Sequence, residues 1–178
     1  VRLGRQFTDP WYGWDNEYGY HEAEVPAFRA ARYLTSNGEF LPFVTTGGYN
    51  DDSLWDEEGL GWRRFAQARH PTFWVQDGDT WKLRLMAEEV SMPWDWPVET
   101  NCHEARAFCR WKARETGLQV RLPSEDEWHR LYDHAGLDEV GMDAPASANL
   151  HLDHWASSCP VNRFPHGDLC DVVGNVWQ

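Results

Sequence analysis

The sequence predicts an α+β domain with about three helices, several short strands and much irregular loop. Three observations support this prediction. Helix-capping residues precede three amphipathic stretches, short aromatic segments of alternating pattern lie between them, and residues 138–170 are rich in Asp, Pro, Gly, Ser and Asn, which is typical of loops. Loops this long in a compact domain are usually functional or held in place by a ligand or metal.

Each predicted helix begins at a cap and ends at a glycine. A Glu three residues after the capping Ser or Asn has the spacing of a capping box, in which two side chains satisfy free backbone N–H groups at the helix start. Apolar residues then recur at helical spacing, so that one face can be buried. The predicted helices lie between Ser36 and Gly47, between Asn101 and Gly117, and between Ser124 and Gly136.

Strands are predicted where short segments alternate between apolar and polar residues. Residues 72–75 and 81–85 flank Asp77-Gly78-Asp79, which is a hairpin signal. Residues 24–33 alternate well enough to predict a further strand, and residues 119–123 predict a short strand that ends in a proline.

The composition is that of a folded acidic protein. The chain has 178 residues, of which 42% are hydrophobic, so it can form a sizeable core. Its 16 Lys and Arg against 29 Asp and Glu give a formal net charge of −13, which disfavours a nucleic-acid partner. Since the sequence has neither a membrane-length apolar run nor an N-terminal signal, we expect no membrane partner and a cytoplasmic location.

Both ends lead us to expect a segment of a longer chain. Val1 is not an initiator methionine, and residues 174–178 form an apolar stretch without a helix cap or polar tail. Complete domains usually end in solvent-compatible sequence. We therefore expect residues 1–178 to form a single domain that is truncated at its C-terminus.

The four cysteines are expected to be reduced, structural thiols. No two of them have the C-x2-C spacing of a zinc or redox site. Cys102 and Cys109 lie two helical turns apart, beyond disulfide reach. One bridge between Cys159 and Cys170 stays open as an alternative, because the sequence does not define the distance between them.

The residue spacing shows no complete catalytic or metal site. His129 and His134 are five apart on a predicted helix and diverge around its axis. His151 and His154 form a close pair in a loop, which we interpret as surface histidines, with a metal site as the alternative. The acidic residues of 51–58 are interpreted as a solvated face rather than as a paired acid and base.

Tryptophan is unusually frequent, with 12 in the chain. We interpret most of these rings as core, because a loop-rich domain with little regular structure needs large side chains to fill its interior. The alternative is a pocket for a flat ligand, a cation or a sugar, bound by stacking and cation–π contact. Both interpretations can hold for different rings.

Six sequence blocks occur in order along nearly the whole chain. They are Gly-Trp-Asp-Asn-Glu at 13–17, His-Glu-Ala-Glu-Val at 21–25, Ser-Asn-Gly-Glu-Phe at 36–40, Pro-Val-Glu at 97–99, Arg-Leu-Pro-Ser-Glu-Asp-Glu-Trp at 121–128, and Asp-Val-Val-Gly-Asn-Val-Trp at 171–177. This set resembles the formylglycine-generating enzyme (sulfatase-modifying factor) domain. The resemblance implies a modified C-type-lectin-like fold, with short strands, a few helices and much irregular chain.

Three tryptophan-containing stretches narrow the resemblance. Residues 13–19, 69–75 and 92–99 are most similar to the ovothiol-pathway 5-histidylcysteine sulfoxide synthases, and the ergothioneine sulfoxide synthases are the next nearest. The resemblance implies that dioxygen drives C–S bond formation between cysteine and the imidazole of histidine, with sulfoxidation. It also implies non-haem Fe(II) held by an upstream helical domain outside residues 1–178, and an active-site tyrosine beyond Gln178. We therefore assign no catalytic residue here and expect the segment alone to be inactive.

Motif membership supplies the candidate site residues. Trp14, Trp94, Trp96 and Trp177 are candidates for substrate binding, with structural roles as the alternative for each. The resemblance implies a weak calcium site formed by Asn175 and Gln178, and Gln178 stands where the family has a Glu ligand. A neutral amide there weakens a site for a hard cation, so a hydrogen-bonding turn is the favoured alternative.

Two other functions stay open. A copper-dependent formylglycine-generating enzyme would act on a sulfatase peptide and would use a cysteine pair beyond residue 178. A non-catalytic lectin-like module would use the tryptophans to bind a sugar or a cationic ligand.

Overall fold

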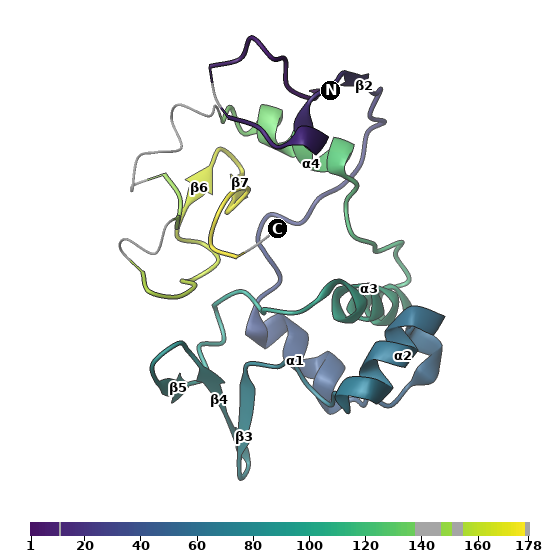
Figure 1. Cartoon of the computed structure of the whole chain (residues 1–178). Helices are drawn as coiled ribbons and strands as arrows, with labels where there is room; N and C mark the ends of the chain where they lie inside the picture. Colours follow the sequence, from purple (N-terminus) through teal and green to yellow (C-terminus); the bar gives the residue numbers. More distant parts are fainter. Residues whose placement is uncertain (11, 138–146, 151–154, 177–178) are drawn as a thin grey trace.

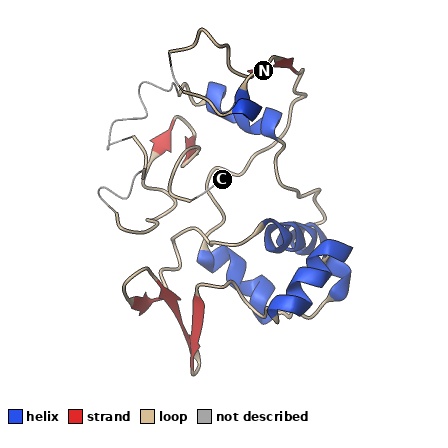
Figure 2. Ribbon diagram, in the orientation of Figure 1, coloured by secondary structure: helices blue, strands red, loops and turns tan. Residues whose placement is uncertain are grey.

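The computed structural model describes residues 1–10, 12–137, 147–150 and 155–176 (Figure 1). Its helices are α1 (Asn37–Thr45), α2 (Glu57–Ala66), α3 (Cys102–Thr116) and α4 (Glu125–His134), with the 3-10 turns η1 (Asp15–Glu17) and η2 (Asp52–Leu54). Its strands are β1 (Arg2–Leu3), β2 (His21–Glu22), β3 (Trp74–Asp77), β4 (Thr80–Arg84), β5 (Glu89–Ser91), β6 (Pro165–His166) and β7 (Leu169–Cys170). All strand pairs are antiparallel and form three small sheets (Figure 2), which confirms the predicted α+β class.

The three predicted helices are present with the predicted caps. The side chains of Ser36, Asn101 and Ser124 accept hydrogen bonds from the backbone N–H three residues later, at 3.1, 3.0 and 3.2 Å. Helix α2 was not predicted, because residues 51–58 were interpreted as a solvated acidic face. Asp56 instead caps α2, with its Oδ1 accepting the N–H of Gly59 at 2.8 Å.

The predicted hairpin is present and carries an additional strand. β3 pairs with β4 around the turn at Gly78, and β4 also pairs with β5. The strand predicted at residues 24–33 is wrong. The segment meets β7 where the N–H of Cys170 donates to the carbonyl of Arg32 at 2.9 Å, but it forms no ladder there, and Pro26 has no N–H to donate to one.

The strand predicted at residues 119–123 is also wrong. The segment is irregular, and its Arg121 bonds to the first turn of α4. The two terminal nitrogens of Arg121 donate to the two carboxylate oxygens of Glu127 at 2.6 Å each. Glu127 Oε2 also accepts the backbone N–H of Ser124 at 2.8 Å. These contacts lower the pKa of Glu127 to about 2, and the Arg121 guanidinium is the main cause. The block at 121–128 therefore forms a charged helix cap.

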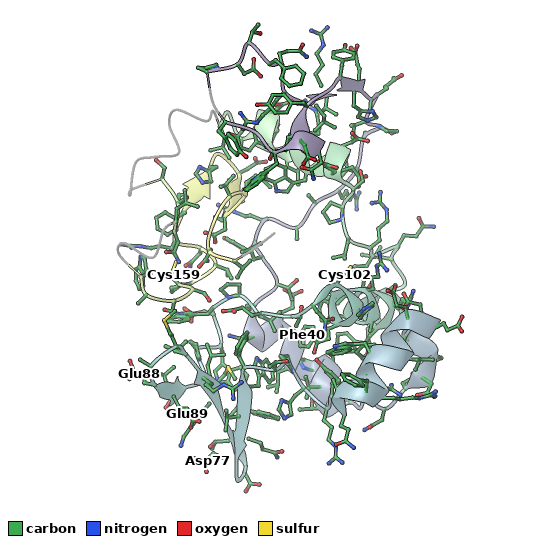
Figure 3. All side chains as sticks on the ribbon, viewed as in Figure 1. Phe40, Asp77, Glu88, Glu89, Cys102 and Cys159 are labelled. Atoms are coloured by element: carbon green, nitrogen blue, oxygen red, sulfur yellow. The ribbon has the colours of Figure 1, made fainter. Side chains whose placement is uncertain are left out.

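An aromatic core lies between α1, α3 and the β3–β4 hairpin. Phe40 (labelled in Figure 3) is buried in it. Its ring stacks on that of Phe108, with ring centroids 4.9 Å apart. Trp74 meets the edge of Phe40 at 6.3 Å, and Trp55 is also buried in the same cluster. These rings confirm the interpretation that many tryptophans fill the interior.

One ionisable pair is buried in this core. The hydroxyl of Tyr49 donates to Glu104 Oε1 at 2.6 Å, while Glu104 Oε2 accepts the backbone N–H of Asn101 at 2.9 Å. Burial raises the pKa of the Glu104 carboxyl above its usual value, and the two hydrogen bonds oppose that rise. The carboxylate thus caps α3 on one side and orients the tyrosine on the other.

All four cysteines are free thiols. Cys102 is exposed at the start of α3, whereas Cys109, Cys159 and Cys170 are buried. In the part of the chain that the structure describes, no helix combines the length and apolar character needed to cross a bilayer.

Candidate functional site

The start of α1 is built on the tryptophan turn of residues 93–97. The first N–H groups of a helix have no partner within the helix. Here the N–H of Asn37 donates to the carbonyl of Trp96 at 2.8 Å, and the N–H of Gly38 donates to the carbonyl of Trp94 at 2.8 Å. Two of the sequence blocks are therefore joined directly through their backbones.

The side chain of Asn37 fixes the same turn from inside. It is fully buried, its Nδ2 donates to the carbonyl of Pro93 at 2.9 Å, and its Oδ1 accepts the indole N–H of Trp74 at 3.0 Å. A buried amide with satisfied hydrogen bonds specifies one arrangement of its partners. Asn37 thereby holds the turn against strand β3.

A second loop, residues 157–161, packs against the other side of the tryptophan turn. The N–H of Val161 donates to the carbonyl of Asp95 at 2.9 Å. The hydroxyl of Ser158 donates to Glu99 Oε1 at 2.9 Å. This loop carries Cys159, which Figure 3 shows between the β6–β7 hairpin and the sheet of β3, β4 and β5.

Asn175 joins this loop to the segment after β7. Its Oδ1 accepts the backbone N–H of Cys159 at 2.8 Å, and its Nδ2 donates to the carbonyl of Cys159 at 3.0 Å. Oδ1 also accepts Nδ2 of Asn149 at 3.2 Å. The backbone of Asn175 is left-handed, with φ of 68°, a conformation that Asn tolerates better than most residues.

Asp171 is the functional candidate that the sequence analysis missed. Its side chain is fully buried, and its backbone is left-handed with φ of 49°. Burial raises the pKa of the carboxyl to about 7, opposed by a hydrogen bond from Asn175. The signal available in the sequence was an Asp directly after the apolar Leu169-Cys170 pair.

The neighbouring thiol is not activated. Burial, together with the negative charge of Asp171, raises the pKa of Cys159 to about 11. The thiolate is the nucleophilic form, so Cys159 is inert near neutral pH. The described part of this region therefore combines loops joined by hydrogen bonds with a buried carboxyl of raised pKa.

The structure brings two of the predicted tryptophans together. Trp94 is 40% exposed and meets the edge of Trp74 at 6.0 Å, while Trp96 is half-buried against the core. Trp14 lies elsewhere, on the N-terminal loop, where its ring meets Tyr12. Trp177 lies outside the described residues, so substrate binding by this set remains a prediction.

The described residues do not fit a bound metal. Within the described ranges, no group of three or more His, Cys, Asp or Glu side chains is placed to hold an ion. The Oδ1 of Asn175 already accepts two N–H groups, which favours the predicted turn over the calcium site. Gln178 and the histidine pair His151 and His154 lie outside the described residues.

Short antiparallel sheets, capped helices and long loops joined by side-chain amides define a loop-rich α+β domain in the part of the chain that the structure describes. The family model for the sulfatase-modifying factor enzyme 1-like domain matches residues 2–178. The chain belongs to this family.

Curated relatives carry two kinds of name. A hercynine oxygenase of Mycolicibacterium thermoresistibile is 31% identical over 99% of this chain and 40% of its own length. One of Mycobacterium tuberculosis is 31% identical over 99% of this chain and 42% of its own length. A formylglycine-generating enzyme of Thermomonospora curvata is 24% identical over 99% of this chain and 66% of its own length. The chain thus spans about two fifths of the length of the hercynine oxygenases it matches.

Proposed function

We propose that this chain is the lectin-like domain of an oxygen-dependent sulfoxide synthase that joins a thiol to the imidazole ring of a histidine-type substrate. The observation that carries the proposal is the similarity to hercynine oxygenases over almost the whole chain, at 31% identity. The match of the family model to residues 2–178 supports a shared fold.

The reaction balances with one molecule of dioxygen. The thiol loses its S–H hydrogen and the imidazole loses a C–H hydrogen, and a C–S bond forms between them. One oxygen atom becomes the sulfoxide oxygen, and the other leaves as water with the two hydrogens. The thiol and imidazole together lose four electrons, which reduce dioxygen.

Two imidazole substrates are candidates. The name of the hercynine oxygenases favours hercynine, the trimethylated betaine of histidine. The tryptophan-containing blocks at 13–19, 69–75 and 92–99 led us to predict histidine with cysteine as the sulfur donor, which would give 5-histidylcysteine sulfoxide for ovothiol synthesis. The two differ in the ammonium group, because histidine can donate hydrogen bonds from it and hercynine cannot.

We propose that the metal, Fe(II), and the residues that bind it belong to another domain of the same polypeptide. The described residues of this chain provide no set of metal ligands. We therefore propose that they bind the substrate and hold the surrounding loops in place. We propose the half-exposed Trp94, on its hydrogen-bonded turn, for contact with a flat or cationic substrate.

The test uses the full-length protein with ferrous iron, dioxygen and cysteine, with either histidine or hercynine, and mass spectrometry of the products. We expect a cross-linked sulfoxide with one of the two imidazoles, and the preferred one identifies the substrate. Cystine or other oxidised cysteine as the sole product would overturn the proposal.

A second candidate is a formylglycine-generating enzyme, because relatives with that name match at 24% and 25% identity. Conversion of cysteine to formylglycine in a sulfatase-derived peptide, in the presence of copper and dioxygen, would favour it. The third candidate, a sugar-binding module, predicts saturable glycan binding without turnover.

A further inference from the structure

We infer that the aromatic surface formed by Phe7, Tyr12, Trp14, Tyr18 and Tyr20 is a docking surface for another part of the same polypeptide, one that presents Arg or Lys beside apolar side chains. This inference rests on the proposed function, in which the reaction needs a further domain.

The first observation is the exposure of these rings. Phe7 is 88% exposed, Tyr12 75%, and Trp14 and Tyr20 are each 66% exposed. Single exposed apolar side chains are ordinary on protein surfaces, but several large rings within fourteen residues are not. A group of this kind is typical of a protein–protein contact, where aromatic residues are enriched.

The second observation is that the rings are arranged in pairs. Phe7 stacks on Tyr18 with centroids 4.4 Å apart and planes inclined by 7°. Tyr12 and Trp14 meet edge to face at 5.4 Å and 81°. These are the two favoured geometries of aromatic pairs, so the rings already hold defined positions relative to one another.

The third observation is that the backbone beneath the rings is held by hydrogen bonds. The N–H of Arg5 donates to the carbonyl of Glu17 at 2.8 Å, and the N–H of Gly19 donates to the carbonyl of Arg5 at 3.2 Å. Glu17 Oε2 accepts the N–H of Trp14 at 2.8 Å. A preorganised loop loses less conformational entropy on binding than a disordered one, which favours docking.

The fold itself does not use these rings. The hydrophobic core cluster of the described residues lies between Phe40 and Trp111 in the sequence. The N-terminal loop lies beside α4, at the end of the molecule opposite the β3–β4 hairpin (Figure 1). Core packing therefore gives no reason for this set of large rings.

The charge of the loop identifies the chemistry of its partner. Residues 1–22 carry the four carboxylates Asp9, Asp15, Glu17 and Glu22 against two arginines, Arg2 and Arg5. A surface that combines aromatic faces with excess negative charge is complementary to Arg and Lys side chains, through cation–π contact and charge pairing. The hercynine oxygenases extend about three fifths of their length beyond the matched region, which supplies chain for such a partner.

The test is hydroxyl-radical footprinting of the intact full-length protein, read residue by residue by mass spectrometry. Phe7 and Phe65 form a matched pair, because both are phenylalanines and this chain leaves them 88% and 91% exposed. We expect Phe7 to be oxidised several-fold more slowly than Phe65, at a rate that does not change on dilution. Equal rates would overturn the inference, and so would protection that disappears on dilution, since that would identify a second copy as the partner.

A variant makes the result specific. Trp14→Arg in the full-length protein places a like charge against the proposed cationic face and should restore rapid oxidation of Phe7. Phe40, which is buried in the core, should stay protected and so distinguishes undocking from unfolding. Continued protection of Phe7 in this variant, with Phe40 still protected, would contradict docking through the aromatic surface. Because the footprint needs no turnover, a protein that protects Phe7 but makes no sulfoxide would refute the proposed function alone.

Discussion

The side-chain amide of Asn175 pairs with the backbone of Cys159 in both directions, accepting its N–H at 2.8 Å and donating to its carbonyl at 3.0 Å. This is the pattern that a neighbouring strand would supply. It joins two irregular segments, residues 157–161 and the segment after β7, which do not pair with each other as strands. In a loop-rich domain, such side-chain pairing replaces part of the missing ladder.

Asn175→Ala should therefore destabilise the domain. The substitution leaves the buried N–H and carbonyl of Cys159 without partners, which we expect to lower the free energy of unfolding by about 2 to 4 kcal/mol. Urea unfolding measures the change, and Asn50→Ala, at an exposed position, is the matched control. A loss no greater than that of the control would show that the amide pairing contributes little.

Asp171 should make stability depend on pH. Its pKa is about 7 in the folded chain against an ordinary value of 3.8, so the folded state holds the proton more tightly. The stabilisation is present in full below pH 3.8 and is lost as pH rises toward 7. The whole effect is at most roughly 4 kcal/mol, since one pKa unit corresponds to about 1.4 kcal/mol.

Asp171→Asn removes the ionisation, keeps the shape and suits the left-handed backbone. We expect thermal and urea unfolding at pH 8 to show a more stable variant, with the advantage disappearing toward pH 4. Asp79→Asn at the exposed hairpin turn controls for the change in net charge. Parallel stability curves for the variant and the unmodified chain between pH 4 and pH 8 would be inconsistent with a raised pKa.

Tyr49→Phe should weaken the core without changing its packing. The substitution removes the hydroxyl that donates to Glu104 Oε1 at 2.6 Å. The buried Oε1 then lacks this hydrogen bond. We expect a loss of about 1 to 3 kcal/mol in the free energy of unfolding at pH 7. Because the Tyr49 hydrogen bond lowers the pKa of Glu104, the variant should also lose stability more steeply as pH rises. Tyr12→Phe, at an exposed ring, should leave chemical denaturation curves unchanged.

Two glycines should respond to alanine with opposite signs. A Cβ at Gly48 would overlap ring carbons of Phe43, which is fully buried and cannot move aside. Gly48→Ala should therefore cost about 1 to 3 kcal/mol or more from overpacking. Gly61 lies inside α2 with open space at its Cβ, so Gly61→Ala should stabilise by about 0.5 to 1 kcal/mol through helix propensity. Melting temperatures that move in the same direction would refute the packing argument.

Helices and turns that are defined by residues close together in the sequence could be predicted. The caps at Ser36, Asn101 and Ser124 act within one helical turn, and the turn at Asp77-Gly78 acts within a hairpin, so the residues that define each element lie side by side in the sequence. Helix α2 has the same kind of cap at Asp56, and it was missed because its first turn is a run of acidic residues that also fits a solvated face. The positive end of the helix dipole favours those carboxylates.

Elements that need a distant partner could not be predicted reliably. Residues 24–33 have a strand-like pattern, but their backbone contact with β7, from the N–H of Cys170 to the carbonyl of Arg32, does not extend into a ladder. The candidate site shows the same limit, because Trp94 and Trp96 could be named from their block, whereas their contact with Asn37 required the tertiary structure. Asp171 was noted in the sequence only as the first residue of the block at 171–177, and its role could not be predicted because its raised pKa comes from burial.

The amino-acid sequence by itself determined the class of the domain, its capped helices and its hairpin, and the family whose blocks it carries. Only the tertiary structure decided which rings are core and which are exposed, and how Asn37, Cys159 and Asn175 join segments far apart in the chain. The physical reason is the range of the interactions. Caps and turns satisfy backbone groups within a few residues, whereas burial and long-range pairing depend on which segments meet after the chain has folded.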